Sequence, residues 1–179
     1  QPTVHTRPGE DGQQFLLRAQ VTGSAGRWPD GAASKDIAWL ALASHDAVGE
    51  IPLSRWHVAD DAARLSSMRY VAHVPDAELF DGPSFTISPS ESWCMDPQQR
   101  QLLEAGYATL YDAHSLRSTV FSENVGVVVG IQATDFASIQ MATPISGMPV
   151  HAVSGTNFSV AAGRLSYVLG LHGACFAVD

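Results

Sequence analysis

Three polar side chains follow the most apolar stretch of the chain, at a position where sheets often bind ligands. Residues 125–131 (VGVVVGI) are continuously apolar and too short for a helix, so they predict a buried strand. Gln132, Thr134 and Asp135 come directly after it. Open α/β sheets bind ligands at the carboxyl ends of their strands. These three residues are therefore candidates for lining a substrate pocket, and the alternative is that they are ordinary loop residues.

Residues suited to nucleophilic, metal or phosphate chemistry are scattered along the sequence. Cys94 and Cys175 are too far apart for a metal knuckle or a disulfide framework, and the histidines have no ligand-like spacing. Gly23 and Gly26 lack both the dinucleotide fingerprint and a P-loop lysine. We therefore expect no metal and no cofactor, and we expect Cys175 to be a small buried core residue.

The charge balance excludes several classes of partner. The chain has 10 Lys and Arg against 18 Asp and Glu, a net charge of -8, so nucleic acid is not expected as a partner. The apolar runs are too short to span a bilayer, so no membrane span is expected.

The small number of cysteines indicates the redox setting. With only two cysteines, a reduced intracellular setting is predicted, cytoplasmic with an organelle left open.

Two helix starts carry strong capping signals. Ser88 precedes Pro89 and is followed three residues later by Glu91, which is the pattern of a capping box with proline at the first helical position. Asp96 and Pro97 repeat the device, and apolar residues follow at helical spacing to Leu110. A short helix followed by a longer one is predicted.

Other segments predict the elements around this pair. An α/β fold is indicated, with a parallel or mixed sheet that helices cover on both faces. The expected elements are a first core strand at 15–21, a buried helix at 37–43, a long loop at 46–85, a helix at 159–169 that begins at a Ser159 cap and ends at Gly170, and a strand from Phe176 to Val178.

Four blocks, in order, resemble the N-terminal half of a thiolase-fold β-ketoacyl synthase. The resemblance covers roughly residues 15–179, and the polar, Pro- and Gly-rich residues 1–14 are taken as a linker. The blocks are 27–31 (RWPDG), 46–52 with Arg55 and Trp56, the helix pair 85–91 and 95–100 with Leu102, Leu103 and Glu104, and the final run 159–171 continuing through Gly173 to Asp179. In the final run, Gly173-Ala174 replaces the family's usual Gly-Pro, which weakens the case for full activity slightly.

The resemblance implies an activity and a set of partners. In the family, Thr-Ala-Cys follows the position of Asp179, and that cysteine accepts the acyl group for a decarboxylative Claisen condensation supported by two histidines of the C-terminal half. The expected partners are the C-terminal half of the ketosynthase, an acyl carrier protein with a phosphopantetheine-linked acyl thioester, and a second copy of the complete domain. The chain alone is then not an autonomous enzyme. The alternative is a non-catalytic structural or interaction subunit derived from a ketosynthase.

The resemblance also assigns residues to roles. Ser154, Gly155, Thr156 and Asn157 resemble the loop that meets the partner subunit near the substrate pocket, so they join Gln132, Thr134 and Asp135 as substrate-binding candidates. Structural roles at the dimer and active-site floor are expected for the remaining motif residues: Asp96, Pro97, Gln98, Gln99, Arg100, Arg164 and Asp179.

Overall fold

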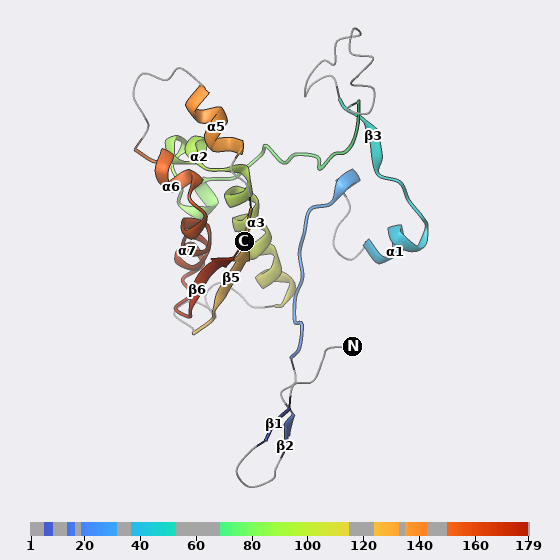
Figure 1. The fold of residues 1–179 in the computed structure, drawn as a ribbon, viewed down its shortest axis with the longest axis vertical. Helices are drawn as coiled ribbons and strands as arrows, with labels where there is room; N and C mark the ends of the chain where they lie inside the picture. Colours follow the sequence, from blue (N-terminus) through green and yellow to red (C-terminus); the bar gives the residue numbers. More distant parts are fainter. Residues whose placement is uncertain are drawn as a thin grey trace.

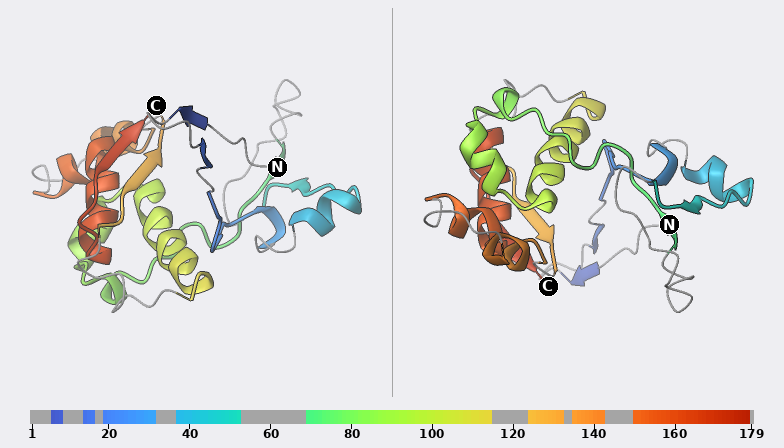
Figure 2. Two further views of the ribbon diagram at one scale, coloured as in Figure 1. Left: turned by 90° about the horizontal axis from the view of Figure 1, so that it is seen from below. Right: turned by 90° about the horizontal axis from the view of Figure 1, so that it is seen from above.

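A computed structural model describes the fold of the chain in several segments. The described residues are 6–8, 14–16, 19–31, 37–52, 69–114, 124–132, 135–142 and 150–178. The helices and strands from α2 onward gather in one cluster, together with the 3-10 turn that directly precedes α2, and the elements from β1 to β4 lie outside it (Figures 1 and 2). The candidate site residues all belong to the later part of the chain.

Two parallel strands form the centre of this cluster. β5 (Val127–Gly130) pairs with β6 (Cys175–Val178), with Val127 opposite Cys175 and Gly130 opposite Val178. Parallel neighbours need a crossover connection, and helices supply it here. These helices are α5 (Asp135–Ala142), α6 (Ala152–Thr156) and α7 (Phe158–Leu169). The predicted strands at both ends of this crossover are confirmed.

Only one face of the strand pair is covered by the described helices. Val127 and Val129 are buried in a cluster with Ala161, Ala162 and Leu169 of α7. On the opposite face Val128 is 62% exposed, and Phe176 and Val178 are exposed as well. The described helices therefore lie on one face of the strand pair, and helical cover of the other face stays a prediction.

The prediction that Cys175 is a buried core residue is wrong, because its side chain is exposed. β6 has β5 as its one neighbouring strand among the described residues. A strand at the edge of a pair is covered from fewer directions than a central strand.

Both predicted capped helices are confirmed. α2 (Pro89–Cys94) begins after Ser88, whose Oγ accepts a 3.2 Å hydrogen bond from the backbone N–H of Glu91. α3 (Pro97–Asp112) begins after Asp96, whose Oδ1 accepts from the N–H of Gln98 at 2.8 Å. Each proline occupies the first helical position, where its missing N–H costs nothing.

α7 ends as predicted but begins earlier. Gly170 terminates it in the left-handed region (φ 70°), and the N–H of Leu171 closes the turn on the carbonyl of Ser166 at 2.9 Å. The N-cap is Asn157 rather than Ser159. Its Oδ1 accepts from both the N–H and the hydroxyl of Ser159, at 3.0 and 2.7 Å. Ser159 therefore donates hydrogen bonds to the capping side chain and is not the N-cap residue itself.

α3 and α7 pack at close range. A Cβ at Gly106 would lie 2.7 Å from Cδ1 of Leu165, so a side chain here would require the Leu165 side chain to shift. A second apolar cluster surrounds the contact, made of Phe85, Ile87, Met95, Leu103 and Val168. α3 and α7 thus pack against both the sheet and the turn that precedes α2.

The segment of residues 19–31 lies along the outer side of α3 (Figure 1). The backbone N–H of Ser24 donates to Oδ2 of Asp112 at 2.9 Å, and Arg27 forms an ion pair with Glu104. The strand predicted at 15–21 appears in the described residues as the shorter β2 (Gln14–Leu16), which pairs with β1 (Thr6–Pro8). β1 lies within the segment predicted as a linker.

Two further predictions for the first half need correction. The helix at 37–43 is present as α1 (Ile37–Leu42), but Trp39 is 75% exposed, so the helix is not buried. The stretch 46–85 is not all loop, because β3 (Val48–Glu50) and β4 (Tyr70–Ala72) form an antiparallel pair. A short 3-10 helix, η1 (Pro29–Gly31), precedes α1, and another, η4 (Pro83–Phe85), precedes α2.

None of the helices that the structure describes combines the length and the apolarity that a bilayer crossing requires.

Candidate functional site

The carboxyl ends of β5 and β6 meet at one edge of the sheet. The register places Gly130 beside Val178, and the N–H of Ile131 donates to the carbonyl of Val178 at 3.1 Å. Gln132 follows this edge with an exposed side chain, and Asp135 is exposed at the first position of α5. Thr134 and Asp179 lie outside the described residues. Gln132 and Asp135, two of the three polar residues predicted to line a pocket, therefore follow the strand that ends at this edge.

The second predicted group lies on α6 and at the start of α7, and its side chains bond locally. The Ser154 hydroxyl donates to the carbonyl of His151 at 3.1 Å, and the Thr156 hydroxyl donates to the carbonyl of Ala152 at the same distance. The Asn157 side chain caps α7. These three groups therefore hold backbone in place, and their side-chain oxygens are already engaged.

Gln99 connects this group to α3. Its side chain is buried, with the residue 2% exposed. Its Nε2 donates to the carbonyls of Ser154 and Asn157, at 3.2 Å each, and its Oε1 accepts from Nε of Arg164 at 3.1 Å. Both amide hydrogens and the amide oxygen are satisfied, as a buried amide requires.

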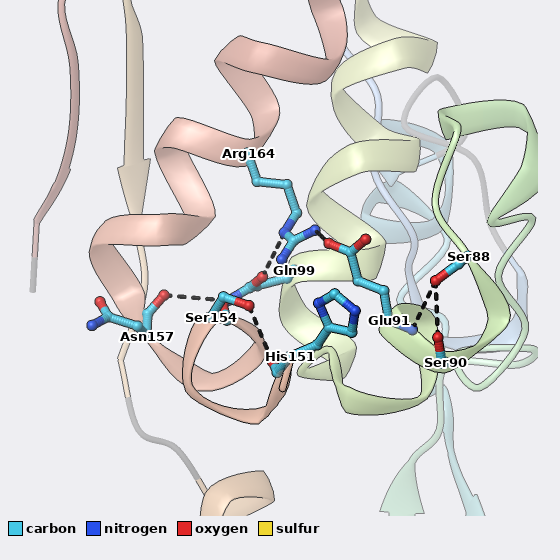
Figure 3. A network of polar contacts seen from close by, with 8 residues as sticks. All are labelled: Ser88, Ser90, Glu91, Gln99, His151, Ser154, Asn157 and Arg164. Atoms are coloured by element: carbon cyan, nitrogen blue, oxygen red, sulfur yellow. Dashed lines mark hydrogen bonds and ion pairs between the residues drawn. The ribbon is translucent and has the colours of Figure 1, made fainter. Parts of the chain in front are cut away.

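Arg164 extends the network to α2 (Figure 3). Its Nη1 forms an ion pair with Oε1 of Glu91, and the exposed fractions of the two side chains are 9% for Arg164 and 24% for Glu91. Glu91 was predicted to complete a capping box with Ser88. The ion pair engages its carboxylate instead, so one half of the capping box is formed. The linked side chains of Glu91, Arg164 and Gln99 thereby connect α2, α7, α3 and α6.

The turn between α2 and α3 is held from two further sides. The backbone N–H of Asp96, a residue only 4% exposed, donates to the carbonyl of Gly155 at 2.9 Å. A Cβ at Gly155 would lie 1.9 Å from the carbonyl oxygen of Cys94, so this contact admits glycine only. From α5, Nε2 of Gln140 donates to the same Cys94 oxygen at 3.0 Å. Pro97 and Gln98 stand in the first turn of α3.

An open pocket of about 430 Å³ adjoins the ion pair. Sequence reasoning did not single out Tyr167, an exposed aromatic residue on α7, or Thr86, whose φ of 60° places it in the left-handed region. No local pattern points to either residue, because the pocket forms only when α7 packs beside the turn before α2. The lining residues are Phe85, Thr86, Ile87, Glu91, Arg164, Tyr167 and Val168.

The network of Glu91, Arg164 and Gln99 holds helices in position and is not arranged for catalysis. Its charged groups are paired and its polar atoms are satisfied by backbone or by one another. Cys94 is buried, and Cys175 is exposed on β6. Within the described segments, no three or more His, Cys, Asp or Glu residues are grouped so as to hold a metal ion.

Comparisons with known proteins give a consistent family match. The family model described as "Beta-ketoacyl synthase, N-terminal domain" matches residues 18–179. The chain is 36% identical over 167 residues to the pikromycin polyketide synthase component PikAII of Streptomyces venezuelae, covering 89% of this chain and 4% of that protein. It is also 36% identical to the phenolphthiocerol synthesis polyketide synthase Pks15/1 of Mycobacterium bovis, over 89% of this chain and 8% of that protein.

A solved structure agrees with these sequence matches. The ketosynthase from module 6 of the bacillaene synthase from Bacillus subtilis 168 superposes with a TM-score of 0.69 at 29% identity, over 88% of this chain and 24% of that one. The predicted thiolase-like α/β fold is thereby confirmed. The chain spans about a quarter of that ketosynthase and less than a tenth of the two synthases.

Proposed function

Because the chain belongs to the β-ketoacyl synthase N-terminal domain family, we propose that it is the N-terminal part of a polyketide synthase ketosynthase that condenses acyl thioesters held on an acyl carrier protein. In this reaction a cysteine thiolate attacks the carrier thioester, a new carbon–sulfur bond forms, the carbon–sulfur bond to the carrier breaks, and the carrier leaves as its thiolate. A malonyl-type extender then loses carbon dioxide, and the resulting carbanion attacks the enzyme-bound acyl carbon and displaces the cysteine thiolate.

The parallel strand pair is the observation that carries this proposal. β6 runs beside β5 and reaches the same carboxyl edge, where Gln132 and Asp135 also lie. The nucleophile and its two supporting histidines come from polypeptide joined to the carboxyl end of β6. A cysteine there would stand where α/β sheets place their ligands. Gln132, Thr134 and Asp135 would then line the acyl pocket.

The polar network has a supporting role in this proposal. Gln99, Arg164 and Glu91 hold α6 and the cap of α7 against the helix pair. Since α7 leads directly into β6, the network fixes the path along which the chain approaches the reactive cysteine. Ser154, Thr156 and Asn157 act on substrate only through backbone that they hold in place.

The uncovered face of the strand pair supports a requirement for the rest of the domain. Val128, Phe176 and Val178 present apolar side chains to solvent on this face. Exposed apolar patches of this kind mark surfaces that pack against other polypeptide. The C-terminal half of the ketosynthase is the partner that fits the proposal.

Acyl transfer to the assembled domain is the direct test. The chain would be produced together with its C-terminal half, incubated with an isotopically labelled acyl thioester and examined by intact and peptide mass spectrometry. The expected result is one acyl adduct on the cysteine of the Thr-Ala-Cys segment, lost when that cysteine is replaced by alanine. Absence of any adduct on correctly assembled material would contradict the proposal.

A second candidate function rests on the same uncovered face. A ketosynthase-derived subunit without catalysis would use this face only to bind a partner. The labelling experiment separates the two functions, because an interaction subunit assembles without becoming acylated.

A further inference from the structure

The carbonyl of Cys94 is a buried acceptor at the carboxyl end of α2. The last carbonyls of a helix have no partner within it, and a buried carbonyl needs a donor. Cys94 is 1% exposed, and Nε2 of Gln140 donates to its oxygen at 3.0 Å. Gly155 packs against the same oxygen, but its N–H is engaged with the carbonyl of His151 at 2.9 Å. Within the described segments, the hydrogen bond to this acceptor therefore comes from α5.

α5 is held in place by little apolar burial. None of its residues is buried against the described segments, and Ile139 and Met141 are 61% and 76% exposed. The helix lies beside α6 and close to α2 (Figure 1). Buried apolar area is the usual attachment between elements, so a helix with little of it depends on its polar contacts. The bond from Gln140 to Cys94 therefore has a large share in fixing where α5 lies.

The other end of α5 adjoins the proposed acyl pocket. Asp135 is the first residue of the helix, and it follows the carboxyl edge of β5, where Gln132 is exposed. Asp135 and Gln140 lie on one unbroken helix, about 7 Å apart along its axis. So short a helix moves as one unit. The attachment at Gln140 therefore also sets the position of Asp135.

We propose that Gln140 is a positioning residue for the acyl substrate, acting through its hydrogen bond to the Cys94 carbonyl. The inference rests on the proposed condensation function and adds to it a residue that governs how the acyl group is bound. Gln140 faces α2 and does not contact the reacting atoms. Its loss leaves β6 and the cysteine beyond it in place but releases the helix that carries Asp135. Acyl binding should therefore suffer, while the reactivity of the thiol should not.

The test compares acyl binding with thiol reactivity in the assembled domain. Gln140→Met keeps the length of the side chain and its helix propensity but removes the donor. Acylation by a labelled octanoyl thioester, followed by mass spectrometry over a range of concentrations, gives the half-saturating concentration and the maximal rate. The former should rise about three- to tenfold, as the loss of one neutral hydrogen bond implies, with the latter unchanged. Alkylation of the same cysteine by iodoacetamide should proceed at the wild-type rate.

Further variants separate positioning from general damage. Gln140→Lys returns a donor of similar reach and should restore part of the affinity. Met141→Leu, next to it on the helix and mostly exposed, should behave as the wild type. If Gln140→Met fails to fold by circular dichroism, Gln140→Glu keeps the shape and also lacks the donor when ionised, so it should give the same rise.

The outcomes distinguish this inference from the proposed function. An unchanged half-saturating concentration in a folded Gln140 variant, or an equal loss of acylation and alkylation rates, would overturn the inference alone. A wild-type domain that assembles but takes up no acyl group would overturn the condensation function, and the inference with it.

Discussion

Gln99 and Arg164 belong to different helices, and Nε of Arg164 donates a hydrogen bond of 3.1 Å to Oε1 of Gln99. This contact fixes the orientation of the amide, because the guanidinium can face only the oxygen. The amide nitrogen must then point toward the carbonyls of Ser154 and Asn157, which accept from it. One buried side chain therefore couples α3 to both α6 and α7.

Replacing this amide should be costly. Gln99→Leu leaves two carbonyls and one guanidinium N–H without their partner in a region that excludes water. The free energy of unfolding should fall by about 2–4 kcal/mol, measured by urea denaturation monitored by circular dichroism. Gln101→Leu is the matched control, since Gln101 is half-buried on the same helix. Equal destabilisation by both substitutions would contradict the assigned role.

The ion pair between Glu91 and Arg164 should show a coupling energy. A double-mutant cycle with Glu91→Gln and Arg164→Gln subtracts the separate loss of the Gln99 contact. Because both side chains are largely shielded from water, we expect a favourable coupling of about 1–2 kcal/mol. Unfolding free energies of the four proteins provide the value, and a coupling within error of zero would show that the contact adds no stability.

The approach of α6 to the end of α2 should tolerate no side chain. Gly155→Ala places a methyl group 1.9 Å from the Cys94 carbonyl oxygen, and the required backbone shift should lower stability by about 2–3 kcal/mol. Gly163 of α7 has open space around its Cβ position. Gly163→Ala should therefore raise stability by about 0.5–1 kcal/mol through helix propensity. Thermal unfolding of the two variants should shift in opposite directions.

Arg100 should detract from stability at ordinary pH. Its pKa is lowered by burial, so the guanidinium is harder to charge in the folded chain than in the unfolded chain. The penalty is present wherever the group is charged in both states, and it is relieved only as the pH rises through the lowered pKa in strongly alkaline solution. Arg100→Met should therefore unfold at an equal or higher urea concentration than the wild type at neutral pH. A clearly lower midpoint would show that Arg100 is fully compensated.

Elements defined by local chemistry were predictable from the sequence. The starts of α2 and α3 depend on a capping side chain followed by proline, and all of the interacting atoms lie within a few residues. The end of α7 depends on Gly170 in the same way. Strand β5 was recognisable from its continuous run of valines. Each of these elements needs no information from distant parts of the chain.

Contacts between distant residues were not predictable in this way. The capping-box pattern at Ser88 implied a local role for Glu91, but Arg164 competes successfully for its carboxylate. The pairing of β3 with β4 joins short, exposed strands that have no apolar alternation. The exposure of Cys175 depends on what covers β6, a property of the assembled sheet. Sequence patterns identify such residues without identifying their partners.

The crossover between β5 and β6 has a consequence for the order in which this protein folds. Everything from Ile131 to Ala174 must be synthesised before the valines of β5 can find the strand beside them. Until then β5 is an unpaired apolar strand, which is prone to aggregate on the ribosome or after dilution from denaturant. Such non-local pairing also slows folding, because the connecting segment must be ordered first. Docking of α7 on α3 is no more local, because the contact between Gly106 and Leu165 spans a longer stretch of chain than the pairing of Val127 with Cys175.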